Sequence, residues 1–266
     1  MNAHLLSWSV FGPATVSFCE ARLDGVVAEP ANAWSSMTYV AVALALLVHA
    51  VSRRREVLVL VAVTGILIGA GSFALHATAT FLGQFLDEAS MFLLSALAVT
   101  LALRRLFGWS PAACVRCYAG LSCASIALLA VVKTSGIPMF ALHMATAMSL
   151  EVVLWRRGAA GVRYGGLHAV LAIFAVAFVL WGLDLTRIAC DGERSHVFNG
   201  HVAWHTLTAV CLVVYYRFQE QFFAPAAAPG EPAGGAMTSM DAMVRAALAH
   251  HPVRDPGAIR PMGARV

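Results

Sequence analysis

The chain has 266 residues, of which 60% are hydrophobic and 12% are charged. Soluble domains carry about 25% charged residues, so this composition excludes an ordinary soluble domain and indicates an integral membrane protein. The net charge of +4 comes from short clusters of arginine between apolar stretches. These clusters do not form the continuous basic surface of a nucleic-acid-binding protein.

Seven stretches of the chain are apolar enough to be membrane helices. A spanning helix needs about 20 mostly apolar residues, and no stretch alternates with the period of two that is typical of a membrane β-barrel. We therefore predict an all-α membrane protein, a seven-transmembrane helix bundle that occupies residues 33–220. The predicted helices are 33–52, 57–78, 85–106, 112–132, 137–155, 165–184 and 197–218.

The arginine clusters predict the orientation of this bundle. They follow the first, third and fifth predicted helices, at residues 53–55, 104–105 and 156–163. Loops rich in arginine stay in the cytoplasm, so the N-terminus is expected outside and the C-terminus inside. Residues 1–32 then form an extracytoplasmic segment. Residues 221–266, which are rich in Ala, Pro and Gly, are expected to form a flexible cytoplasmic tail.

Five polar side chains are predicted to lie at one membrane level near the outer surface. Ser72 and His76 share one face of the second helix, and Asp87 is expected to open the third helix. His201 and His205 share a face near the start of the seventh helix. Ionisable residues inside a membrane helix are functional candidates by default.

The three histidines have the pattern of a zinc site. Two histidines four residues apart on a helix commonly bind one metal ion, and a third from another helix leaves one coordination position open. An open position is typical of catalytic zinc. A single intramembrane histidine is often only a packing residue, and Ser72 in a glycine-rich segment could simply allow close helix packing.

These residues resemble the alkaline ceramidase family, which belongs to a larger group of seven-helix membrane hydrolases that includes the progestin and adiponectin receptors. The shared features are Ser-x3-His, "LDE" and His-x3-His. The resemblance implies hydrolysis of the ceramide amide to a sphingoid base and a fatty acid. It implies His76, His201 and His205 as zinc ligands, Asp87 as the base that activates a zinc-bound water, and Ser72 as the stabiliser of the oxyanion.

The resemblance extends to two further segments. "SFCEARLDGVVAEPANAWSS" and "LWGLDLTRIAC" match family segments whose cysteines form a disulfide in animal members, which implies a bond between Cys19 and Cys190. Animal members also bind calcium near the N-terminus, and Glu20 and Glu29 are candidate ligands for a calcium-like site. Arg22 stands where a further ligand is expected, so calcium regulation is not carried over to this chain.

Three alternatives remain beside the lipid amidase. The first is a zinc-containing lipid receptor of the same group, with little or no turnover. The second is a haem protein, although haem ligands usually come from two facing helices. The third is a metal transporter, which would place ligands along a path through broken helices. The expected partner is a membrane lipid substrate, ceramide or a related lipid amide, and no nucleic acid. The composition and short loops indicate a bacterial inner-membrane protein.

Overall fold

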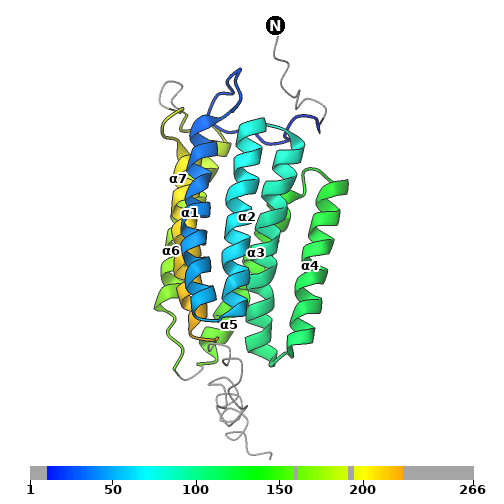
Figure 1. The fold of residues 1–266 in the computed structure, drawn as a ribbon, viewed down its shortest axis with the longest axis vertical. Coiled ribbons are helices and arrows are strands. Elements are labelled where there is room, and N and C mark those ends of the chain that lie inside the picture. The colour runs from blue at the N-terminus through cyan, green and yellow to red at the C-terminus, as the bar shows by residue number, and fades with distance from the viewer. Residues whose placement is uncertain (1–10, 159–160, 191–194, 224–266) are drawn as a thin grey trace, which may run out of the picture. The chain divides into compact units, whose positions relative to one another are not determined.

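The computed structural model describes residues 11–158, 161–190 and 195–223. Most of the predicted flexible tail lies outside these residues. The described residues form seven helices and no strand, apart from one isolated β-bridge, so the all-α prediction is confirmed for this part of the chain. The helices are α1 Pro30–Ser52, α2 Glu56–Thr78, α3 Phe81–Phe107, α4 Pro111–Val131, α5 Gly136–Arg156, α6 Gly165–Leu185 and α7 Gly200–Glu220 (Figure 1).

The helices coincide with the seven predicted stretches, and the largest difference is at the start of α3. The connection from α2 consists only of Ala79 and Thr80, because Thr80 caps α3 by accepting the N–H of Gly83 at 3.2 Å. The prediction that Asp87 opens this helix is therefore wrong. The cap starts the helix at Phe81 and places Asp87 inside it.

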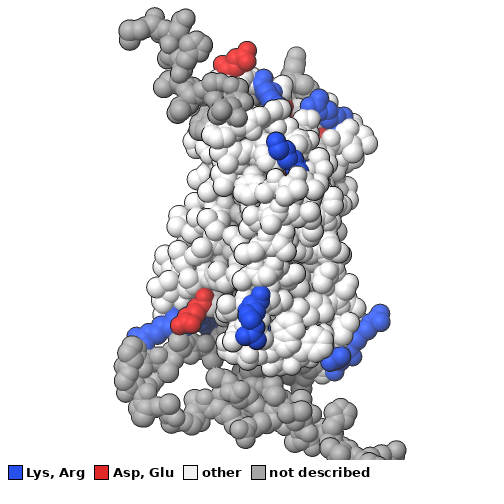
Figure 2. All heavy atoms as spheres, turned by 90° about the vertical axis from the view of Figure 1, so that its right-hand side faces the viewer, with Lys and Arg blue, Asp and Glu red and all other residues white. Residues whose placement is uncertain are grey.

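Six helices, α1 to α6, are long and apolar enough to cross a membrane. On the face drawn in Figure 2, charged side chains gather toward the two ends and an uncharged band lies between them. These features indicate a multi-pass membrane protein. Helix α7 has 21 residues but carries two histidines, Arg217 and Glu220, which lower its hydropathy. The seventh span and the orientation of the termini therefore stay predictions.

The centre of the bundle lies between α1, α2, α3 and α7. Its buried apolar cluster includes Tyr39, Leu58, Leu97 and Leu212. Glycines in α2 allow close approach, since a Cβ at Gly65 would lie 2.5 Å from a methyl carbon of Leu212. Helices α4 and α5 pack on α3, and α6 packs on α7, whereas α5 and α6 do not pack closely on each other.

Residues 12–29 lie across the end of the bundle where α2 ends and α7 begins, which we call the histidine end. The N–H of Glu29 donates to the carbonyl oxygen of His76 at 2.9 Å. A disulfide between Cys19 and Cys190 joins this segment to the chain after α6, as the family resemblance implies. The segment is thus held to the end of α2 and to the chain that follows α6.

Candidate metal centre

Three buried histidines meet at the histidine end. His76 lies on α2, and His201 and His205 lie on α7. One ring nitrogen from each residue lies within 4.8 Å of the other two, and the Nε2 atoms of His76 and His201 are 3.0 Å apart. The side chains are almost fully enclosed, with exposures of 0%, 4% and 2% respectively. The structure therefore brings together all three histidines that the sequence singled out.

The start of α7 is fixed by two polar side chains. Asn199 caps the helix by accepting the N–H of Val202 at 2.8 Å. Asp184, in the last turn of α6, is buried and accepts two backbone N–H groups. These come from His201 at 3.2 Å and from Cys19 at 2.9 Å. Asp184 thus connects the helix that carries His201 to the N-terminal segment.

A hydrogen bond to a carboxylate assigns the tautomer of one histidine. Nδ1 of His76 lies 2.7 Å from a carboxylate oxygen of Glu29, which can only accept, so in a neutral ring Nδ1 carries the proton. Nδ1 of His205 lies 2.8 Å from the hydroxyl of Ser35, and that hydroxyl donates its single proton to the carbonyl oxygen of Asn32 at 3.0 Å. The two ring nitrogens of His205 thus each face a hydroxyl group, Ser35 at Nδ1 and Ser72 at Nε2. In the neutral His76 ring the lone pair lies on Nε2.

This donor set fits a metal ion that prefers nitrogen ligands. The Nε2 lone pair of His76 can coordinate a metal ion, and ligating histidines commonly donate their other N–H to a carboxylate or similar group. At zinc–nitrogen distances of about 2.0–2.1 Å, tetrahedral ligand nitrogens lie roughly 3.3 Å apart, which is close to the 3.0 Å between the Nε2 atoms of His76 and His201. Among the described residues, Nδ1 of the buried His201 has no hydrogen-bond partner.

Ser72 connects the histidines to Asp87. Its hydroxyl oxygen lies 3.1 Å from Nε2 of His205 and also interacts with the Asp87 carboxylate. The neighbouring Gly71 permits this, because a Cβ there would lie 2.6 Å from the carbonyl oxygen of Leu86 and 2.9 Å from the Cα of Asp87. A hydroxyl group and a carboxylate thus lie together beside the candidate metal ligands.

The two carboxylates of the candidate calcium-like site have partners within the protein. Glu20 accepts two backbone N–H groups in the first turn of α1, each at 2.8 Å, and so caps that helix. Glu29 contacts His76 and pairs with Arg22 at 3.4 Å. Burial raises the pKa of Glu29, but hydrogen bonds from His76 and Asn32 and the charge of Arg22 outweigh it, so the pKa lies below its usual range. The expectation that calcium regulation is not carried over to this chain stays a prediction.

Three contacts around the histidines were not predicted from the sequence. The Phe18 ring packs on His201 with centroids 3.9 Å apart, Ser35 holds His205, and Glu29 holds His76. Ser35 is one of several polar residues near the start of α1, and polar residues in a predicted membrane helix are a usable signal. The contacts of Phe18 and Glu29 depend on how the N-terminal segment folds over the bundle, which no spacing rule reveals.

The family comparison covers both the helices and the N-terminal segment. The Ceramidase family model matches residues 12–231, so the chain belongs to the Ceramidase family. A comparison with curated protein sequences gives no match.

Proposed function

We propose that this member of the Ceramidase family is a zinc-dependent amidase that hydrolyses ceramide or a related lipid amide. The family match points to hydrolysis of a lipid amide, and the three histidines offer a metal site. The observation that carries the proposal is the meeting of three buried histidines, each with a ring nitrogen within 4.8 Å of the other two. Glu29 supports it, because it accepts the N–H at Nδ1 of His76 and so leaves the Nε2 lone pair of that ring available to a metal.

The side chains around the histidines suit amide hydrolysis. Zinc bound here would lower the pKa of a coordinated water to about 7 and polarise the amide carbonyl. Asp87 would accept the proton of the attacking water and later deliver it to the leaving amine. Ser72 would donate a hydrogen bond to the oxyanion that develops on the carbonyl oxygen. The contact between Ser72 and Asp87 supports these roles because it keeps both groups beside His205.

The position of the site suits a substrate that stays in the bilayer. The candidate site lies at one end of apolar helices, and α5 and α6 do not pack closely on each other. A lipid amide could therefore reach the histidines laterally while its hydrocarbon chains remain among the helices. We further propose that α7 is the seventh span and that the histidine end faces outward from a bacterial inner membrane, with the arginine clusters in the cytoplasm.

The test is hydrolysis of ceramide by protein purified in detergent, with the released fatty acid measured directly. We expect turnover that is lost on chelation, returns with zinc, and is absent in Asp87→Asn. Saturable ceramide binding with no release of fatty acid from zinc-loaded protein would contradict the amidase and favour the receptor alternative.

A further inference from the structure

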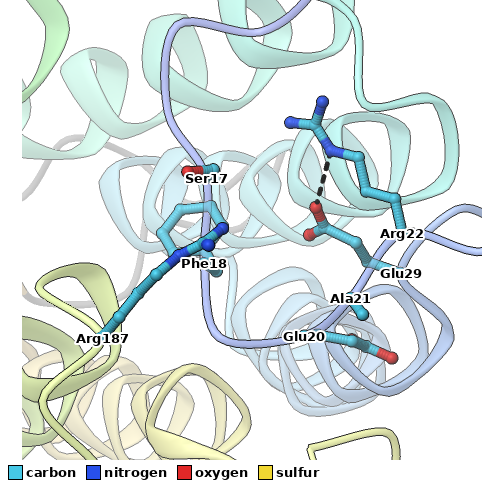
Figure 3. Close-up of a pocket in the computed structure, with 7 residues that line it drawn as sticks. All are labelled: Ser17, Phe18, Glu20, Ala21, Arg22, Glu29 and Arg187. Carbon is cyan, nitrogen blue, oxygen red and sulfur yellow. Dashed lines mark hydrogen bonds and ion pairs between the residues drawn. The ribbon is translucent and has the colours of Figure 1, made fainter. Parts of the chain in front are cut away.

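A pocket of about 290 Å³ lies beside the candidate metal centre (Figure 3). Its lining residues are Ser17, Phe18, Glu20, Ala21, Arg22, Glu29 and Arg187. Phe18 lines this pocket and also contacts the candidate metal ligands. Its ring packs on His201 and His76, with centroid distances of 3.9 and 5.3 Å. The pocket thus borders the histidines through Phe18 and also through Glu29, which contacts His76. Its volume suits a headgroup rather than a whole lipid.

The acidic residues of this pocket are already engaged. Both oxygens of Glu20 accept backbone N–H groups at the start of α1. One oxygen of Glu29 accepts from His76, and the other pairs with Arg22. Both glutamates are buried, with exposures of 2% and 3%. Their negative charge is therefore offset by hydrogen bonds within the protein and is less available to a ligand.

The basic residues keep unused hydrogen-bond donors. Arg22 uses Nε for Glu29 and Nη2 for the carbonyl oxygen of Val16 at 3.3 Å, while its side chain is 41% exposed. Arg187 is exposed, and its guanidinium makes no hydrogen bond or ion pair with any described residue. Its backbone has a φ of 57°, a conformation that glycine adopts more readily. In Figure 3 the two arginines approach from opposite sides of Phe18.

We propose that this pocket binds the anionic headgroup, a phosphate or carboxylate, of the lipid amide whose amide bond lies at the histidines. The proposal rests on the proposed function. Guanidinium groups pair strongly with phosphate and carboxylate oxygens, and basic pockets at the ends of membrane helices are suited to lipid headgroups. The substrate class would then be an acidic lipid amide rather than neutral ceramide.

The test compares phosphorylated ceramide with ceramide of the same acyl chain, in wild type and in Arg187→Gly. This variant removes the Arg187 guanidinium and eases the backbone, so a loss does not come from added strain. The control is Lys133→Ala, which removes a positive charge at the same end of the bundle, where Lys133 lies over the ring of Phe81. We expect wild type to prefer the phosphorylated lipid in kcat/KM by about tenfold. Arg187→Gly should lose this preference through KM, and Lys133→Ala should keep it.

An unchanged preference in Arg187→Gly would overturn the proposal. If zinc-loaded wild type hydrolyses neither lipid, the proposed function fails, and binding of dihexanoyl phosphatidic acid then tests the pocket separately. Binding that weakens about tenfold in Arg187→Gly would support an anionic headgroup site. Equal binding by the variant, or equally tight binding of inorganic phosphate to wild type, would contradict it, because the second result describes a site for free anions.

Discussion

Replacing Glu29 should weaken metal binding without removing any metal ligand. Its carboxylate lies 2.7 Å from Nδ1 of His76, and the two side chains are 4% and 0% exposed. Loss of such an outer partner typically lowers metal affinity 10–100-fold, or about 1.4–2.7 kcal/mol. Glu29→Gln keeps an acceptor oxygen but loses the charge, so we expect a loss of about tenfold. Glu29→Ala leaves the N–H of His76 without its partner and should approach 100-fold.

The assay is competition for zinc between the purified protein and a chelator of known affinity. Glu20→Gln is the matched control, because Glu20 is an equally buried glutamate of the same segment that caps α1 and contacts none of the three histidines. It should lower the melting temperature while leaving zinc affinity unchanged. Wild-type affinity in Glu29→Gln, or an equal loss in Glu20→Gln, would refute the assignment of Glu29 as the partner that orients His76.

Three further perturbations test separate parts of the structure. Ser72→Ala should slow ceramide turnover by about 10²–10³ with zinc content unchanged by mass spectrometry; full activity would reduce Ser72 to a packing role. Gly71→Ala should destabilise the protein by about 1–3 kcal/mol, seen as a lower melting temperature, because the new Cβ would lie 2.6 Å from the carbonyl oxygen of Leu86. A reductant should lower the melting temperature of wild type but not of Cys19→Ser/Cys190→Ser, since the disulfide joins positions 171 residues apart. An equal effect on both proteins would contradict a stabilising disulfide.

The helices were predictable because their signal is local. Apolar runs of the right length mark α1 to α6 directly. The start of α3 was predicted too late because Thr80 is a polar cap inside the sequence "ATATFLGQ", where hydropathy alone gives no boundary. Helix α7 was predicted correctly although it contains several polar residues. Because of these residues, α7 is not among the six helices that are apolar enough to span a membrane.

The candidate ligands were predictable from spacing, whereas their partners were not. His201 and His205 share a helix face by their separation alone, and the turn between α2 and α3 brings Ser72 near Asp87. The contacts of Glu29 with His76 and of Glu20 with α1 arise from a loop that folds back over the bundle. Spacing in a loop carries no periodicity. The family resemblance therefore singled out these carboxylates as candidate calcium ligands, and no pattern in the sequence indicated their contacts with His76 and α1.

The most direct test of the central claim is zinc content measured by mass spectrometry on detergent-purified protein, wild type beside His201→Ala/His205→Ala. The same samples are assayed for ceramide hydrolysis. The account predicts about one zinc per chain in wild type, and joint loss of zinc and hydrolysis in the variant. Hydrolysis by a wild-type protein that holds no zinc, or wild-type zinc content in the variant, would contradict it.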